Sequence, residues 1–382
     1  MNILVVCQYG LYHDFGASFV HAQAREYVRL GHQVRAIVLL PIGKRDWDGK
    51  RFSDSRRTVD GVELYTMRHI SFSNYGEKSL NKLFAYRSLH KKANALLEGF
   101  VPEIIHTHFL GTASEAGAWL KKRLGIPLAV TTHGSDTSVP LRQGRGSELK
   151  ALCNHADAVT AVSTALAQKV RSCGTETRVS VILNGFNLQA LPEHLEKAEG
   201  SIIQAGHLLE QKRFHITIRA FQQLQTDCPG AVLVLVGDGP EQKKLEALCQ
   251  SLGLDGSVQF TGKIPNHEVL SKMGSSQFFV MPSVQEGFGI VYLEAMACGC
   301  IAIGTEGEGI ADLIVSGENG FLVPPDQPET IAKTILWCLK HPKEASAIAE
   351  RGRQAALGLT WEKNAMQYIS LFESLKERKC SQ

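Results

Sequence analysis

The chain has 382 residues, of which 44% are hydrophobic and 21% charged, and its formal net charge is +3. These values describe an ordinary soluble globular protein that is long enough for two hydrophobic cores. No stretch approaches the roughly 18 apolar residues of a membrane span, and the first residues lack the basic segment of a signal peptide. We therefore expect a cytoplasmic protein.

Charge and cysteine usage narrow the class of partner. Residues 1–195 carry 24 basic and 16 acidic side chains, whereas the remainder carries 17 and 22. The basic excess is spread out, which argues against a nucleic-acid binder and suits an acidic ligand or an anionic membrane surface. The nine cysteines are odd in number and form no C-x-x-C, so neither a disulfide framework nor a zinc ribbon is expected.

Short apolar runs alternate with amphipathic stretches along the chain. In the first half the apolar runs are 2–7, 33–40, 103–107, 128–132 and 158–162, with helical patterns at 18–30 and 113–124. In the second half they are 201–205, 231–236, 257–260, 277–281, 301–304 and 321–323, with helical patterns at 214–226, 240–252, 290–298 and 328–340. This rhythm predicts two tandem doubly wound α/β domains, each with a parallel sheet covered on both faces.

A polar segment separates the two series. Residues 187–200 have no strand pattern, so we place the domains at 1–190 and 191–360. The tail 361–378 is an amphipathic helix. Its apolar side consists of Trp361, Ala365, Tyr368, Ile369 and Phe372.

The segment EGFGIVYLEAMACG at 286–299 carries two carboxylates in an unusual setting. Gly287 and Gly289 allow a tight turn, and a helix beginning near Ile290 would offer its N-terminus to an anion. Glu286 would lie just outside that N-terminus and could accept hydrogen bonds from hydroxyls. Glu294 lies on an otherwise apolar helix face, where a charge is costly without a polar partner. A capping residue and a surface glutamate remain the alternative interpretation.

Two other strand-to-helix turns accompany this segment. AGHLLEQKRF at 205–214 brings Lys212 and Arg213 close to a helix start, and GDGP at 237–240 follows another strand. Ligands of open α/β sheets bind at these carboxyl ends of the strands, and a cation there suits a diphosphate. The alternative is a solvated pair on a surface helix.

These segments together are similar to a known family. AGHLLEQKRF, LVGDGPEQKKLEAL, VQFTGKIP, MPSVQEGFGIVYLEAMACG and SGENGFLVPPDQPETIA occur in this order. They resemble the nucleotide-sugar domain of retaining glycosyltransferases of family 4, which have the GT-B fold and an E-x7-E motif matched by Glu286 and Glu294. The resemblance covers nearly the whole chain. It implies two Rossmann-like domains that face a cleft, with residues 361–382 packing back on the first domain.

The resemblance also implies roles for residues of the second domain. Glu286 would contact hydroxyls of the donor sugar, Glu294 the nucleotide ribose, and Lys212 the leaving diphosphate. The turn Gly287–Phe288–Gly289–Ile290 would offer backbone N–H groups to the phosphates, and the backbone at Ile264 would face the base.

The sequence departs from the family at two positions. His207 stands where the family pattern G-R-x-x-x-x-K-G has Arg, and Arg213 replaces the glycine after the lysine. Histidine is a weaker and pH-dependent partner for a diphosphate. Either Arg213 compensates for this change or phosphate binding is weaker.

In the first domain the resemblance implies a further set of site residues. Gly16 matches the loop over the donor phosphates, and His133 matches a histidine that contacts the donor sugar. Asp14, His108 and Asp136 are assigned to the acceptor side. We predict no metal, because the pair His106 and His108 has no evident third ligand and DWD at 46–48 follows no apolar strand.

The segment 77–97 reads as a basic helix with Leu80, Leu83, Phe84 and Leu97 among five Lys and Arg side chains. Such a helix can lie on an anionic membrane, which would place the protein peripherally at the inner face. The alternative is a domain helix with a solvated basic face.

The favoured hypothesis is a retaining glycosyltransferase that moves a sugar from a nucleoside-diphosphate sugar, UDP-linked, to a hydroxyl acceptor. The acceptor would be a saccharide or a lipid-linked glycan of a cell-surface polysaccharide. The sugar nucleotide is a substrate, so no cofactor is expected. A sugar-nucleotide epimerase of the same fold and a non-catalytic sugar-nucleotide binding module remain as alternatives.

Overall fold

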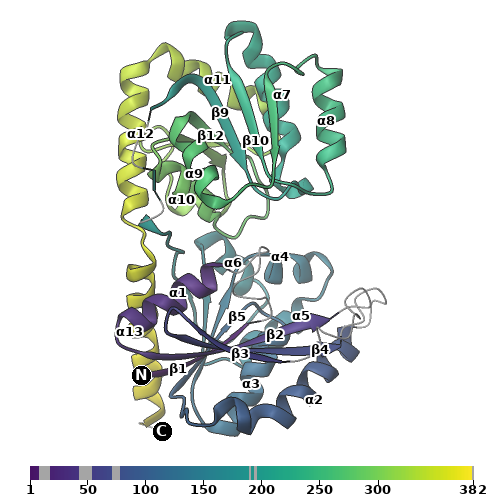
Figure 1. The fold of residues 1–382 in the computed structure, drawn as a ribbon, viewed down its shortest axis with the longest axis vertical. Helices are drawn as coiled ribbons and strands as arrows, with labels where there is room; N and C mark the ends of the chain where they lie inside the picture. The colour runs from purple at the N-terminus through teal and green to yellow at the C-terminus, as the bar shows by residue number, and fades with distance from the viewer. Residues whose placement is uncertain (8–17, 43–53, 71–77, 189–190, 193–195, 381–382) are drawn as a thin grey trace. The chain divides into compact units, whose positions relative to one another are not determined.

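The computed structural model describes residues 1–7, 18–42, 54–70, 78–188, 191–192 and 196–380. The chain forms two compact units, one of Met1–Leu183 with Trp361–Gln382 and one of Asn184–Thr360 (Figure 1). Each contains a largely or wholly parallel sheet with helices packed on it, so the predicted α/β class with two Rossmann-like domains is confirmed. Among the described helices, none is both long enough and apolar enough to cross a membrane.

The sheet of the first unit has the strand order β3-β4-β2-β1-β5-β6-β7-β8. All of its strand pairs are parallel except β3–β4. Its strands are β1 (Asn2–Cys7), β2 (Gln33–Ile42), β3 (Ser55–Val59), β4 (Val62–Ile70), β5 (Ile104–His108), β6 (Leu128–Thr132), β7 (Ala158–Ala161) and β8 (Val179–Val181). Its helices are α1 (Ser18–Arg29), α2 (Lys78–Leu97), α3 (Thr112–Leu124), α4 (Ser135–Arg142), α5 (Gly146–Asn154), α6 (Thr164–Arg171) and α13 (Trp361–Cys380).

Strand β3 of the hairpin β3–β4 is absent from the apolar runs of the sequence, for a physical reason. The exposed edge strand β3 consists of SRRTV and has no buried face to produce an apolar pattern. Its turn is the dipeptide Asp60–Gly61, in which both φ angles are positive, at 48° and 77°. Such Asp-Gly turns match the twist of a two-residue hairpin, so this dipeptide was the available signal.

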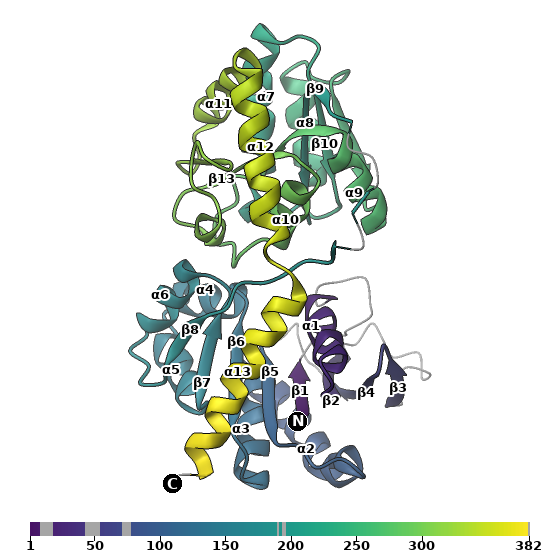
Figure 2. The ribbon, with the colours of Figure 1, turned by 90° about the vertical axis from the view of Figure 1, so that its left-hand side faces the viewer.

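Helix α13 belongs to the first unit and packs along its sheet beside α1 (Figure 2). The predicted apolar face is buried, with Tyr368 and Phe372 exposed by 1% or less. The Tyr368 hydroxyl lies 2.9 Å from the hydroxyls of both Thr131 on β6 and Thr160 on β7. A buried hydroxyl requires partners, so this network sets the position of the helix on the strands as well as its burial.

The second unit has a six-stranded parallel sheet in the order β11-β10-β9-β12-β13-β14. Its strands are β9 (Ala198–Ala205), β10 (Val232–Val236), β11 (Val258–Gly262), β12 (Ser276–Val280), β13 (Ile301–Thr305) and β14 (Phe321–Val323). Its helical elements are η4 (Glu210–Lys212), α7 (Phe214–Asp227), α8 (Gln242–Ser251), α9 (Asn266–Ser275), α10 (Ile290–Ala297), η5 (Gly309–Asp312), α11 (Pro328–Lys340) and α12 (Pro342–Leu357).

The direction of strand progression reverses between β9 and β12. From β9 the chain continues outward through β10 and β11, and it then returns to place β12 on the other side of β9. The loops that follow β9 and β12 therefore leave the sheet toward opposite faces. In doubly wound sheets such a reversal is the point at which a crevice for ligands opens, at the carboxyl ends of the two central strands.

We predict that Phe372→Ala lowers the free energy of unfolding of the first unit by about 3–5 kcal/mol, because the ring is completely buried between helix and sheet. Thermal unfolding followed by circular dichroism would measure the change. Met366→Ala on the same helix is the matched control, since its side chain is 53% exposed and its loss should be nearly neutral. Equal effects of the two substitutions would contradict the packing of α13.

Candidate functional site

The crevice of the second unit brings together a cation and a carboxylate. Lys212 ends η4 in the loop after β9, and Glu286 lies in the loop after β12. The Lys212 Nζ donates a hydrogen bond to Glu286 Oε2, and each side chain retains 19% exposure. A backbone hydrogen bond of 2.9 Å from Val284 N to Gln211 O also joins the two loops. The predicted site residues Lys212 and Glu286 therefore meet.

The turn Gly287–Ile290 leads directly into α10. Gly289 is the N-cap with a φ of 82°, and its side-chain position is filled by a neighbour, because an added Cβ would lie 2.7 Å from Tyr292 Cδ2. Phe288 is 1% exposed and anchors the turn in the core. No side chain of the described residues caps this helix. The N-terminus thus keeps backbone N–H groups and the positive end of the helix dipole for an anion.

Glu294 lies one turn into α10 and has a weak polar partner. Asn266 Nδ2, at the start of α9, donates a hydrogen bond of 3.4 Å to Glu294 Oε1. Burial raises the pKa of the Glu294 carboxyl to about 7, and the Asn266 contact opposes this shift. A carboxyl kept in such an unfavourable environment is a common property of functional sites.

The turns after β9 and β10 pack tightly on one another. An added Cβ at Gly237 would lie 1.9 Å from Gly206 O, and one at Gly239 would lie 2.6 Å from Leu208 O, so neither position accepts a side chain. This close approach places His207 beside Asp238, with 3.3 Å between Nδ1 and Oδ1. Both side chains are about half exposed. The histidine that replaces the family arginine therefore stands at the crevice edge next to a carboxylate.

Arg213 has a different environment from that of Lys212. Its backbone is left-handed, with φ 54° and ψ 36°, in the position where the family pattern has glycine. Its guanidinium Nε lies 3.1 Å from Asp326 Oδ1, in the segment before α11. The charge of Arg213 is thus paired within the protein. Ile264, the predicted base contact, is partly buried in the segment between β11 and α9.

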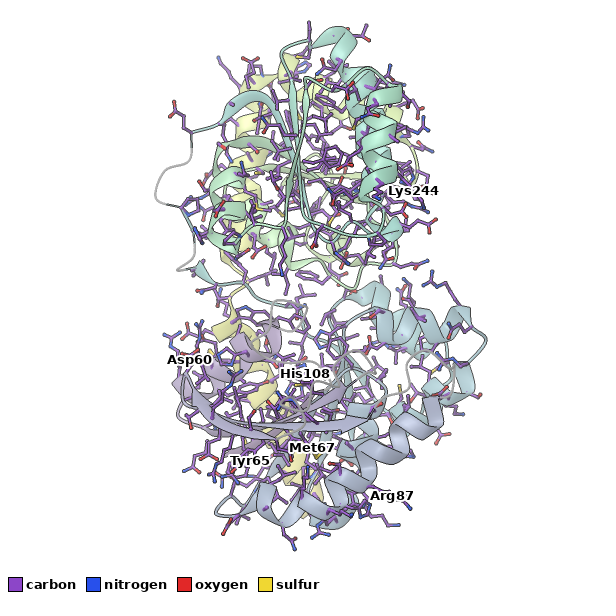
Figure 3. All side chains as sticks on the ribbon, turned by 45° about the vertical axis from the view of Figure 1, so that its right-hand side comes forward. Asp60, Tyr65, Met67, Arg87, His108 and Lys244 are labelled. Atoms are coloured by element: carbon purple, nitrogen blue, oxygen red, sulfur yellow. The ribbon has the colours of Figure 1, made fainter. Side chains whose placement is uncertain are left out.

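In the first unit, the buried His108 and the partly buried His133 form a pair at the carboxyl ends of β5 and β6. His108 Nδ1 lies 3.1 Å from His133 Nε2, and Figure 3 shows His108 inside the unit. Phe19 and Phe109 contact the His133 ring, with centroids 4.6 Å and 4.7 Å away. Burial lowers the pKa of His108 to about 3 and that of His133 well below its ordinary value. Both imidazoles are therefore neutral at neutral pH.

Asp136 supports the turn that carries His133. Its carboxylate accepts backbone hydrogen bonds from Leu110, His133 and Gly134, at 2.8, 3.0 and 2.9 Å. Burial raises the pKa of Asp136, and these donors act in the opposite direction. Both carboxylate oxygens are thus used within the unit. The predicted contacts of His108 and Asp136 with an acceptor stay predictions.

Some predicted features fall outside the described residues, and the side chains of the predicted basic helix are described only from Arg87 onward. Gly16, Asp14 and the segment 46–48 lie outside the described residues. Among the described side chains of α2, Arg87 is exposed (Figure 3) and so is Lys91, whereas Lys92 pairs with Asp54.

Two residues of the site were missed in the sequence. Asn266 is the polar partner of Glu294, and Glu308, in the loop after β13, accepts backbone hydrogen bonds from the loop that carries Glu286. Neither occurs at a motif spacing. The only available signal was that both follow apolar runs, and hence lie at the carboxyl edge of the sheet.

Comparisons with known proteins agree with this geometry. Residues 191–355 match the family model of glycosyl transferases group 1, and residues 16–190 match that of Glycosyltransferase Family 4. An uncharacterized glycosyltransferase of Methanocaldococcus jannaschii is 28% identical over 322 residues, which cover 84% of this chain and 89% of that protein. A putative colanic acid biosynthesis glycosyltransferase of Salmonella typhimurium is 26% identical and covers 84% of this chain and 81% of its own.

A solved structure agrees with the fold. The Anabaena protein HepE, in complex with UDP and glucose, superposes with a TM-score of 0.74 at 23% identity, over 98% of this chain and 100% of that one. The two units, their strand order and the two family matches define the class of the molecule as a GT-B glycosyltransferase. Within that class the chain belongs to the glycosyltransferases of group 1, with a family 4 domain preceding the group 1 domain.

We predict that Glu294→Gln stabilises the free protein in a pH-dependent way. The fold holds the Glu294 proton more tightly than the unfolded chain does, so stability falls as the pH rises from 4.5 to about 7 and is constant above. The substitution removes this loss, which amounts to at most about 3 kcal/mol at pH 8 and much less at pH 5. Urea unfolding at the two pH values measures it. The exposed Glu268→Gln is the control, and an equal gain at both pH values would contradict the prediction.

We predict that Arg213→Gly is more stable than Arg213→Ala by about 1 kcal/mol, because only glycine adopts the left-handed conformation without strain. Both variants lose the ion pair to the half-exposed Asp326, so their comparison isolates the backbone. Thermal unfolding midpoints measure the difference. An alanine variant as stable as the glycine variant would show that the turn relaxes.

Proposed function

We propose that the protein is a retaining glycosyltransferase that transfers a sugar from a nucleoside-diphosphate sugar to a hydroxyl acceptor. The observation that carries the proposal is the Lys212–Glu286 pair beside the N-terminus of α10, in the crevice where the strand order reverses. A positive side chain and a helix N-terminus suit a diphosphate. A carboxylate next to them suits the hydroxyls of the attached sugar.

We propose that different residues bind the diphosphate, the sugar and the ribose of the donor. Lys212 and the N–H groups at Phe288, Gly289 and Ile290 stabilise the charge that develops on the diphosphate as the bond to the sugar breaks. Glu286 accepts hydrogen bonds from the sugar, which orients its anomeric carbon. Glu294 accepts hydrogen bonds from the ribose, and this contact offsets the cost of burying its carboxylate. We propose that these groups supply the positive charge without a metal.

We propose front-face transfer, which retains the anomeric configuration. The bond from the anomeric carbon to the diphosphate oxygen breaks first and leaves an oxocarbenium-like centre. The acceptor hydroxyl then forms its bond on the same face, and its proton passes to the departing phosphate oxygen. The histidines of the first unit fit a supporting role. His133 is proposed to contact the sugar as a neutral hydrogen-bonding group, and His108 and Asp136 to hold it.

The donor and the acceptor are proposed from the relatives. The HepE structure contains UDP and glucose, and the Salmonella relative bears a colanic acid biosynthesis name. We propose by analogy a UDP-sugar donor and a saccharide or lipid-linked acceptor of a surface polysaccharide. We propose that the enzyme acts in the cytoplasm, where the exposed Arg87 and Lys91 of α2 would contact an anionic membrane.

We predict that Glu286→Ala lowers kcat/KM for sugar transfer at least about 100-fold, because the sugar loses the carboxylate that orients it. The assay incubates the protein with UDP-, GDP- and ADP-sugars and an acceptor mixture, and follows nucleotide release and labelled product. Glu318→Ala, an exposed substitution in the same unit, is the control. Undiminished transfer by Glu286→Ala would remove the role assigned to Glu286.

The same assay, together with thermal unfolding in the presence of nucleotides, separates the alternatives. Conversion of the sugar nucleotide without an acceptor would indicate an epimerase. A rise in melting temperature with a nucleotide, but no turnover, would indicate a binding module.

A further inference from the structure

The loop that carries Glu286 follows β12, which lies between β9 and β13 in the sheet. Lys212 contacts this loop from the β9 side, and Glu308 contacts it from the β13 side. Glu308 lies after β13, and its carboxylate accepts two hydrogen bonds from consecutive amides of that loop. Gln285 N donates to Oε1 at 2.8 Å, and Glu286 N donates to Oε2 at 2.9 Å. Each oxygen therefore has one donor. Such two-point bonding of a carboxylate sets both the position and the direction of the backbone that it holds.

The conformation of Gln285 explains why this contact is needed. Its φ is 63°, in the left-handed region that costs a non-glycine residue about 1–2 kcal/mol. A left-handed residue turns its own N–H and the next one toward the same side, which forms a small concave site for an anion. Glu308 is the anion that fills it. A strained turn of this kind persists only where its surroundings determine it.

The neighbouring glycine shows that the two loops fit closely. An added Cβ at Gly309 would lie 2.1 Å from Gly287 O and 2.8 Å from Phe288 Cα, so a side chain there would push the loop away. Gly309 thus lets the segment Glu308–Gly309 approach the backbone on both sides of Glu286. The contact is a closely packed one rather than a single exposed hydrogen bond.

Glu286 is consequently fixed at two points. Glu308 holds its backbone amide, and Lys212 holds its carboxylate. The nucleotide-binding groups proposed above have other supports, because Glu294 lies within α10 and Phe288 is anchored in the core. Loss of Glu308 should therefore disturb the sugar contact more than the nucleotide contact.

We propose that Glu308 is a positioning residue for sugar transfer, which holds the strained Gln285–Glu286 turn so that the Glu286 carboxylate faces the donor sugar. This inference rests on the proposed function, and it adds that recognition of the sugar, separately from that of the nucleotide, depends on the β13 loop. Glu308 itself touches no reacting atom and acts through Glu286.

The test compares Glu308→Ala and Glu308→Gln with Glu306→Ala. Glu306 lies two residues earlier in the same loop, and its side chain is exposed, so it is the matched control. We expect Glu308→Ala to lower kcat by about 10–100-fold, the size of effect that a misplaced catalytic group produces. Glu308→Gln should fall between it and the wild type, since the amide retains one acceptor oxygen. Glu306→Ala should keep the wild-type rate.

Two further measurements distinguish positioning from general damage to the fold. The affinity for UDP alone, by calorimetry, should change less than threefold in Glu308→Ala, whereas the affinity for the UDP-sugar should fall with kcat. Hydrogen exchange of the peptide 283–289 should accelerate in Glu308→Ala and not in Glu306→Ala.

The outcomes separate the two levels of inference. An active wild type, an inactive Glu286→Ala and a Glu308→Ala rate within threefold of the wild type would overturn the role of Glu308 alone. Equal loss of UDP and UDP-sugar affinity would assign Glu308 to the general fold of the unit and would also overturn it. A wild type that transfers no sugar from any donor would overturn the proposed function, and with it the catalytic role of Glu308.

Discussion

The ion pair between Lys212 and Glu286 is the interaction on which the site of the second unit depends. It joins the loops that follow β9 and β12, the two strands between which the order of strands in the sheet reverses. Without a ligand the two charges neutralise each other, so the crevice does not hold an unpaired lysine. Under the proposed function, a bound diphosphate would offer Lys212 a second anion and a bound sugar would offer Glu286 new donors. The same pair can thus stabilise the free protein and be shared with a substrate.

The loops around this pair make close backbone contacts with one another at positions where only glycine fits. Gly237 and Gly239 let the turn after β10 lie against the turn after β9, and Gly309 does the same between the loops after β13 and β12. Each contact fixes one loop against its neighbour at the carboxyl edge of the sheet. The loops thereby support one another as a continuous rim. A binding site built on loops acquires from this rim the rigidity that strands would otherwise supply.

The sequence predicted the two α/β domains, because parallel strands that are buried on both faces leave clear apolar runs. It also placed Lys212 and Glu286 in one donor site because both follow central strands, and the structure shows that their side chains form an ion pair. It could not show that Glu308 binds the Gln285–Glu286 amides, because a contact over more than 20 residues has no local pattern. It left open whether Arg213 compensates for His207 at the diphosphate, and it gave no sign that the Arg213 guanidinium pairs with Asp326. That outcome depends on a left-handed φ and a distant partner, which composition and periodicity do not contain.

The candidate groups of the two units differ in charge. The second unit presents charged groups, Lys212 and Glu286, in a crevice that remains partly exposed. The first presents a neutral imidazole, His133, because burial and the neighbouring His108 both oppose its protonation. A neutral ring can donate or accept a hydrogen bond without attracting the diphosphate. A sugar nucleotide carries its charge at one end and neutral hydroxyls at the other. Taken by itself, each unit thus has the chemistry of the group proposed for it: charged side chains for a diphosphate in the second unit, and a neutral ring for sugar hydroxyls in the first.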